Sequence, residues 1–307
     1  MNNITLVTAF FDLKRDTWDG FSRSNNDYLE YFRFWARINN DLVVYTTADV
    51  AKTVFEIRNE FGLASRTFIY VIDDFRTIDE EMYSSYCEQM AFTESLAFRL
   101  IKHVPESYNP AYNYLTCLKP WFLRDAAKKG HVFDFASWID FGFNHGGEVF
   151  SNASQFDFTW TYDFPRKVNL FSIRDMAALP LFEVVRTSST AIMGAFIVTP
   201  LELIDELYAI TKSISNALSI CGLPDDDQTV LEASVKSRPD VFIVNKSSWH
   251  LPIFHYGNSA LDVRPSKTLA IWKAPLVGIF VKAGKSYNIF KYSYVFLAAS
   301  LKRIFRG

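Results

Sequence analysis

The sequence predicts an α/β fold in which a mixed, mostly parallel sheet is flanked by helices. Short apolar runs alternate with amphipathic helical segments through the first half of the chain, a pattern that favours parallel strands covered on both faces. The chain has 307 residues and a hydrophobic content of 49%, so it can bury a full core. Together these observations indicate a globular protein with the sheet at its centre.

The first half of the chain shows the alternation most clearly. Strands are expected over residues 4–10, 42–46 and 67–72, because each is a short apolar run. A helix is expected over residues 25–39, and a second over residues 49–61, closed by Gly62. The apolar positions of the first helix recur at helical spacing and are Tyr28, Tyr31, Phe32, Trp35 and Ile38.

The second half continues with longer helical segments and further strands. A helical region over residues 78–102, a loop at 105–110 and a helix at 121–129 lead to a buried strand at 132–139. Residues 144–166 are rich in Gly, Asn and Asp, so we expect an irregular, mobile flap. The remaining elements are strands at 168–173 and 191–198, helices at 200–220 and 227–236, and an apolar run at 241–244.

The sequence shows no domain boundary before its C-terminal part. No repeat or low-complexity linker occurs before about residue 265, so we expect one catalytic-type domain over residues 1–265 and a tail over residues 266–307. The whole chain has 32 basic and 34 acidic side chains, but no Asp or Glu follows Asp262. Nine basic residues lie beyond that point: Arg264, Lys267, Lys273, Lys282, Lys285, Lys291, Lys302, Arg303 and Arg306.

This basic tail is interleaved with aromatic and aliphatic residues, a composition favoured at anionic membrane surfaces. The alternative is a C-terminal helix packed on the body with a solvated basic face. The rest of the chain is acidic and would repel phosphates, which argues against a nucleic-acid partner. The three cysteines are widely spaced, no basic leader precedes the first strand, and no apolar run is long enough to span a bilayer. We therefore expect a cytoplasmic protein, peripheral on the inner face of the membrane.

The segment from Trp138 to Gly142 is the most informative in the chain, because Asp140 stands where an apolar strand runs out into a loop. In open α/β sheets ligands collect at the carboxyl ends of strands. An unpaired buried carboxylate is costly, so a cation, hydrogen-bond donors or a substrate are expected beside Asp140. A loop-capping Asp is the alternative. The chain lacks P-loop, dinucleotide-binding, α/β-hydrolase and zincin signatures, which leaves acids and histidines at strand ends as the candidates.

Other strand ends and helix starts carry further candidates. The end of the first strand, Thr8-Ala9-Phe10-Phe11-Asp12, suits a nucleotide base or ribose, although an ordinary turn would look the same. Lys119 and Arg124 precede the Asp140 strand, where a cation would offset diphosphate charge; either is equally compatible with a solvated helix.

The run Asp225-Asp226-Asp227-Gln228 opens a helix, and one acid there would stabilise the helix N-terminus. Asp226 and Asp227 remain as candidates to bind an acceptor hydroxyl or to take its proton. A neutral imidazole from the 249–257 segment, His250 or His255, would complete the coordination of a divalent ion held by Asp140. His145, close after Asp140, is the competing candidate.

Three of these stretches resemble the HtrL/YibB family of bacterial proteins, which look like GT-A glycosyltransferases. They are the opening Ile4 to Asp12 with Arg15, the Trp138 to Gly142 strand end, and Asp226-Asp227-Gln228. The resemblance covers about residues 3–250. It implies a GT-A-like fold and a metal held by an acid pair at the Asp140 position, but Gly142 replaces the second acid, which places metal dependence in question.

The resemblance further implies sugar transfer from a nucleotide-sugar, first of all a UDP-sugar, to a polysaccharide or lipid-linked glycan acceptor in bacterial surface glycan biosynthesis. Asp227 would be the base, with Asp226 beside it, and Mn²⁺ or Mg²⁺ would be bound by Asp140 and His255. A non-catalytic GT-A-like binding or scaffolding protein is the alternative, and a metal-dependent phosphoester hydrolase is a third interpretation. The residues expected to bind the donor are Thr8, Ala9, Phe10, Asp12, Arg15, Lys119, Asp140, Gly142 and Gly194.

Overall fold

The computed structural model describes residues 2–18, 22–176 and 179–264. Residues up to Val263 belong to one compact unit. The basic tail predicted over residues 266–307 lies outside the described residues, so its expected role at a membrane stays a prediction. Within the described ranges, no helix is both long enough and apolar enough to cross a membrane.

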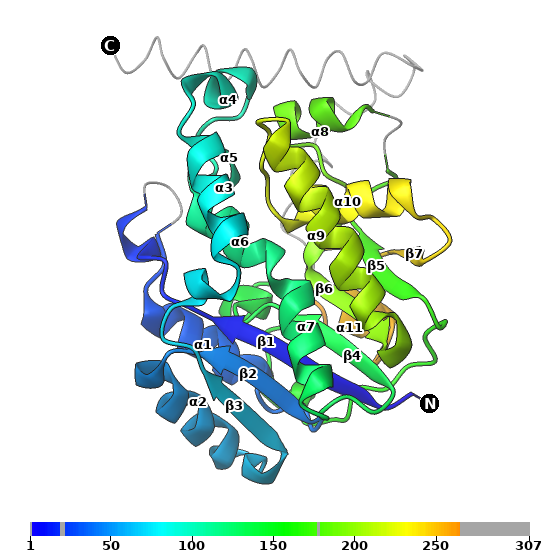
Figure 1. Cartoon of the computed structure of the whole chain (residues 1–307). Helices are drawn as coiled ribbons and strands as arrows, with labels where there is room; N and C mark the ends of the chain where they lie inside the picture. Colours follow the sequence, from blue (N-terminus) through cyan, green and yellow to red (C-terminus); the bar gives the residue numbers. More distant parts are fainter. Residues whose placement is uncertain (1, 19–21, 177–178, 265–307) are drawn as a thin grey trace, which may run out of the picture. The chain divides into compact units, whose positions relative to one another are not determined.

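A seven-stranded sheet organises the described part of the chain, in the order β3-β2-β1-β4-β6-β5-β7 (Figure 1). Its first four strands in this order are mutually parallel, β6 is antiparallel to both of its neighbours, and β7 is parallel to β5. The predicted mixed, mostly parallel sheet is therefore confirmed. The strands are β1 Ile4–Phe10, β2 Leu42–Thr46, β3 Thr67–Val71, β4 Phe135–Ile139, β5 Val168–Ser172, β6 Ile192–Pro200 and β7 Phe242–Lys246.

Helices cover both faces of the sheet, as Figure 1 shows for α7 and α9 on one of them. One core cluster joins α1 and α2 to the sheet, and the other joins α3, α6, α7 and α9. The helices are α1 Asn25–Trp35, α2 Ala48–Glu60, α3 Glu80–Met90, α4 Thr93–Phe98, α5 Pro105–Tyr108, α6 Pro110–Cys117, α7 Lys119–Lys128, α8 Leu181–Thr187, α9 Ile204–Ile220, α10 Asp227–Ser237 and α11 Pro252–His255.

Two expectations about local structure were wrong. Residues 105–110 are not a loop: a proline occupies the first position of α5 and of α6, where its missing N–H costs nothing and its φ suits a helix. Residues 144–166 do not form a flap, because their aromatic side chains pack into the core around α1 and β6. The buried aromatic side chains of this segment are Phe150, Phe156, Trp160 and Phe164.

Arg58 of α2 is fully buried and ties together the edge of the sheet at which β2 and β3 begin. Its guanidinium donates to the carbonyls of Ala36, Ile38 and Asn40 at 2.7–2.9 Å and to Thr67 Oγ1 at 2.9 Å. Burial lowers the pKa of Arg58 to about 10, so the side chain stays charged at neutral pH. These bonds satisfy carbonyls that water cannot reach, which is what buried polar groups require.

Candidate functional site

The candidate site is built around a buried ammonium held between two carboxylates. β4 ends at Ile139, and Asp140 follows with its backbone N–H still bonded to Ala195 of the neighbouring β6. Lys119, at the start of α7, places its Nζ 2.9 Å from Asp140 Oδ1 and 2.7 Å from Asp227 Oδ2. The side chain of Asp140 is 40% exposed, whereas those of Lys119 and Asp227 are buried. The acid predicted at this strand end therefore has a cation beside it, as expected.

Lys119 has no hydrogen left for a diphosphate. Its third contact is with the carbonyl of Gly194 at 2.9 Å, and an ammonium carries three hydrogens. Lys119 was expected to bind the donor; in this structure its ammonium contacts Asp140, Asp227 and the Gly194 carbonyl. Trp138 supports the same arrangement, because its Nε1 donates to Asp140 Oδ1 at 2.7 Å.

Gly194 of β6 makes room for Asp227. A Cβ at position 194 would lie 1.9 Å from Asp227 Oδ2, so any other residue would displace the carboxylate. Gly194 was expected to bind the donor, and the group that lies against it in this structure is the Asp227 side chain. The contact explains how an acid at the start of α10 reaches the sheet.

Burial shifts the charges of this cluster. It raises the pKa of the Asp227 carboxyl above its ordinary value, although Lys119 opposes the rise. Burial alone would lower the pKa of the Lys119 ammonium, but the charges of Asp140 and Asp227 outweigh it and the net pKa is raised. Asp227 is thus a carboxylate with increased basicity, next to a permanently charged ammonium.

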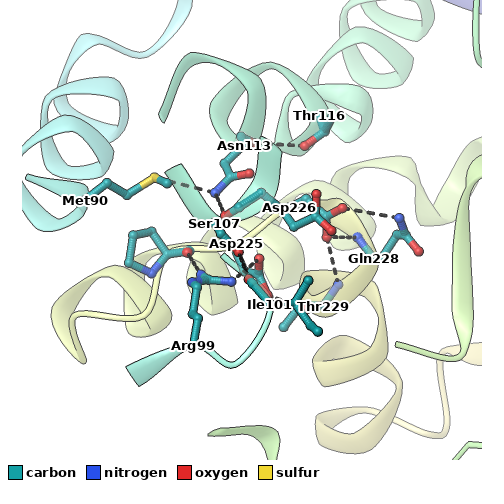
Figure 2. Close-up of polar contacts among 12 residues, drawn as sticks. Met90, Arg99, Ile101, Ser107, Asn113, Thr116, Asp225, Asp226, Gln228 and Thr229 are labelled. Carbon is teal, nitrogen blue, oxygen red and sulfur yellow. Dashed lines mark hydrogen bonds and ion pairs between the residues drawn. The ribbon is translucent and has the colours of Figure 1, made fainter. Parts of the chain in front are cut away.

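The other two acids of the run hold local structure (Figure 2). Asp226 caps α10, because its Oδ1 accepts from the backbone of Gln228 at 3.1 Å and of Thr229. Asp225 accepts from Arg99 at 3.1 Å and from the Thr229 hydroxyl at 2.7 Å. Burial, and then the neighbouring acids Asp227 and Asp225, raise the pKa of Asp226 well above its ordinary value. Of the two predicted catalytic acids, Asp226 is therefore the cap of α10, whereas Asp227 pairs with Lys119.

The end of β1 and the start of α1 form a second part of the site. The Arg15 guanidinium donates to the Tyr28 hydroxyl and lies over the Trp18 ring, 5.0 Å from its centroid. Gly142 packs against Tyr28, where a Cβ would lie 2.9 Å from the ring. Phe10 stacks on Phe141 rather than facing solvent. The predicted residues Phe10, Arg15 and Gly142 are therefore brought together around Tyr28.

Two polar atoms in this second part are buried without a hydrogen-bond partner in the described part of the chain: Arg15 Nε and Thr8 Oγ1. Unsatisfied buried groups are rare and call for a reason, such as a ligand. Ala9 is partly buried beside Thr8. Asp12 instead bonds Lys14 through the Lys14 backbone N–H at 2.6 Å and the ammonium at 2.7 Å.

A third group lies just past Asp140 along the chain. His145, Glu148 and His250 offer ligand atoms that all lie within 4.8 Å of one another. Burial lowers the pKa of His250 to about 4 and also lowers that of His145, so both imidazoles are neutral at pH 7. The negative charge of Asp140 acts to raise the pKa of both rings, which indicates that Asp140 lies near His145 and His250.

His255 was the expected metal ligand, but it has other neighbours. Its Nδ1 bonds Ser247 Oγ at 3.0 Å, and its ring packs on Phe254 and Tyr256. No contact in the described ranges joins it to Asp140. Arg124 likewise lies apart from the acids above, because it pairs with Asp205 on the surface.

Residues 2–256 match the model of a family described as "Bacterial protein of unknown function (HtrL_YibB)". The chain belongs to this family. It is 28% identical over 259 residues to protein HtrL of Escherichia coli strain K12, and the match covers 80% of this chain and 88% of that protein. The family that the sequence motifs indicated is thus confirmed.

Two solved structures also resemble this HtrL_YibB protein. Mouse xyloside xylosyltransferase 1 in its apo form is 11% identical, with 78% of this chain and 84% of that chain covered and a TM-score of 0.39. PaToxG glycosyltransferase is 10% identical, with 76% and 68% covered and a TM-score of 0.32. The first is named as a xylosyltransferase and the second as a glycosyltransferase.

Sequence reasoning missed several members of the candidate site. Glu148 had a usable signal, because it stands three residues after His145 in a glycine-containing turn. Arg99 had none, since its pairing with Asp225 depends on how α4 ends against α10. Glu106 is also close to the acids: burial raises its pKa, and the charges of Asp225 and Asp227 add to the rise.

Proposed function

We propose that this chain is a glycosyltransferase of the GT-A type that transfers a sugar from a nucleotide-sugar to a hydroxyl acceptor. The observation that carries the proposal is the Asp140–Lys119–Asp227 cluster at the edge of the sheet where β1 and β4 end, with one carboxylate half-exposed and one buried. Sugar transfer with inversion needs a base for the incoming hydroxyl, and the departing diphosphate needs a cationic environment.

Asp227 is the proposed base. Burial raises the pKa of its carboxyl, so the group accepts a proton more readily than an exposed Asp, while the Lys119 ammonium favours its ionised form. Asp140 has one oxygen bound by Lys119 and Trp138, and its exposed part is offered to the bound sugar. Asp226 supports this pair by fixing the first turn of α10.

The donor is proposed to bind at the end of β1. Arg15 Nε and Thr8 Oγ1 are buried donors without a partner among the described residues, as expected of groups that wait for phosphate or ribose oxygens. Trp18 and Tyr28 frame the Arg15 guanidinium with aromatic rings, which suits a nucleotide base. The preference for a UDP-sugar rests on the family resemblance alone.

The acid pair that would hold Mn²⁺ or Mg²⁺ at Asp140 does not fit this structure. Gly142 stands at the second position, and Asp140 Oδ1 already contacts Lys119 and Trp138, which leaves one carboxylate oxygen for an ion. A hard cation of this kind needs several oxygen ligands. The proposed reaction therefore assigns leaving-group stabilisation to Arg15 and derives no step through a metal at Asp140.

The first test is a screen of UDP-, GDP-, CMP- and dTDP-sugars for binding by calorimetry and for release of the nucleoside diphosphate or, with CMP-sugars, of CMP. We expect one nucleotide class to bind and to be hydrolysed slowly without an acceptor. Binding should weaken about tenfold or more in Arg15→Ala, because charged hydrogen bonds to phosphate contribute about 1.5–3 kcal/mol. Binding without turnover would indicate the non-catalytic alternative, and no binding to any of the four would refute the proposal.

The acceptor and the location are the finer parts of the proposal: a lipid-linked glycan in surface polysaccharide synthesis, met at the inner membrane surface. The support is the basic, aromatic tail in the sequence, where each basic residue contributes about 1 kcal/mol at an anionic membrane. Deleting residues 286–307 should lower co-flotation with anionic liposomes and leave the weak recovery with neutral liposomes unchanged. Equal recovery of both proteins would refute the membrane role without touching the donor site.

A further inference from the structure

We propose that His145, Glu148 and His250 form a binding site for a transition-metal dication, with Zn²⁺ as the best-matched ion. The ligand atoms of these three residues all lie within 4.8 Å of one another. The proposal is independent of sugar transfer, because it concerns only whether and where an ion binds.

The three ligands come from two turns that lie far apart in the sequence. His145 belongs to the 3-10 turn Phe143–Gly146, and Glu148 follows directly, with an Oε2 2.9 Å from His145 Nδ1. His250 comes from the turn after β7. The turns meet where the Asn144 N–H donates to His250 Nδ1 at 3.3 Å. That nitrogen's lone pair is directed at this turn and accepts from the Asn144 N–H, so an ion bound through Nδ1 would displace this long hydrogen bond.

Backbone conformation at these turns is unusual. In the described part of the chain, five residues other than glycine have positive φ, and three of them are Asn144, His145 and His250. Such conformations cost about 1 kcal/mol or more each and persist where the surroundings fix them. Here Asn144 is fixed by its side chain, whose Oδ1 accepts from two backbone N–H groups, those of Val149 and Phe150, at 2.9 Å. The turn that carries His145 is thus held in a conformation that its residues do not favour by themselves.

The donor set selects the ion. Two imidazoles and one carboxylate suit Zn²⁺ and neighbouring transition metals, whereas Mg²⁺ prefers oxygen ligands. In a tetrahedral zinc site with bonds of about 2.0–2.2 Å, the ligands lie about 3.4 Å apart, so the atoms must approach one another slightly. Glu148 is exposed and its carboxylate is held through His145, while His250 is buried with its ring against Phe143 and His145. Three protein ligands leave a fourth position for water or for a ligand oxygen.

The experiment is metal binding by the full chain, without a histidine tag and after chelation, measured by calorimetry with ZnCl₂ and MgCl₂. We expect about one equivalent of Zn²⁺ to bind and no comparable binding of Mg²⁺. The affinity for Zn²⁺ should fall at least tenfold in His250→Ala and in Glu148→Gln. His255→Ala is the matched control and should bind as the wild type does, because His255 lies outside the cluster.

Glu148→Gln keeps the test independent of folding, since Glu148 is exposed and its substitution should leave the melting temperature in EDTA unchanged. As a second readout, Co²⁺ should give the visible absorption bands of a tetrahedral complex in the wild type and in His255→Ala only. Equal Zn²⁺ affinity in the wild type, Glu148→Gln and His250→Ala would overturn the assignment. A preference for Mg²⁺ would overturn the choice of ion.

Discussion

Replacing Lys119 by Met is expected to lower the free energy of unfolding at pH 7 by about 3–5 kcal/mol, because breaking a buried ion pair leaves uncompensated charge. Lys119 holds Asp227, which is buried, and Asp140, which is half-exposed. Met keeps most of the volume of the Lys stem but removes the ammonium. Urea unfolding followed by circular dichroism measures the change.

The loss should shrink as the pH falls. Burial already raises the pKa of Asp227 in the folded protein, and removing Lys119 raises it further. A folded state that binds more protons than the unfolded one gains stability as the pH drops through the window between the two pKa values. The deficit of Lys119→Met relative to wild type should therefore be smaller at pH 5 than at pH 7. A deficit that does not change with pH would contradict this electrostatic explanation.

Lys129→Met is the matched control. Lys129 pairs with Asp125 at 2.5 Å, but its side chain is 37% exposed. Exposed ion pairs contribute about 0–1 kcal/mol, so this substitution should change the unfolding free energy by less than about 1 kcal/mol. Equal losses in the two variants would mean that burial at Lys119 has no special effect.

Asp227→Asn is expected to lower kcat by about 10²–10⁴-fold with the donor that the nucleotide-sugar screen identifies, because general-base catalysis contributes an effect of that size. Asn has nearly the shape of Asp and can still accept from Lys119, so donor binding should change little. The rate in the wild type should rise with pH through the pKa of the base, which burial places above the ordinary value of about 3.9. This acidic limb should be absent from the residual rate of the variant.

The control for this variant is Asp205→Asn, which removes a surface acid that pairs with Arg124. Its kcat should match that of the wild type. A turnover number for Asp227→Asn within about threefold of wild type would remove Asp227 from the role of base. Arg15→Ala would still report on the donor site in that case, so the two assignments fail separately.

Sequence patterns predicted the sheet because its strands are short, continuous apolar runs that are buried on both faces. They also placed Asp140 correctly, since a strand end is visible in the pattern. The predicted flap over residues 144–166 was wrong. Its Gly, Asn and Asp residues are typical of irregular loops, but the aromatic residues between them belong to the core. Phe150, Phe156 and Trp160 follow no regular period, yet each is fully buried.

The composition of the candidate site was harder to predict because its contacts are long-range. Nothing local indicates that Asp227 lies on Gly194, or that Lys119 uses all its hydrogens within the protein. Which of His145, His250 and His255 lie together depends on left-handed turn conformations, and residue patterns do not encode these conformations. His145 and His250 meet because Asn144 and its side-chain bonds shape the first of these turns.

The buried network of Arg58 has a consequence for where the protein opens. It lies at the edge where β2 and β3 begin, whereas Asp140 and Lys119 lie at the opposite edge, where β4 ends. Local opening is cheapest where few buried bonds must break. Amide hydrogens of β2 and β3 near Arg58 should therefore exchange with deuterium among the slowest in the chain. A buried cation thus anchors one end of the parallel strands, and a second buried cation positions the acids of the candidate site at the other end.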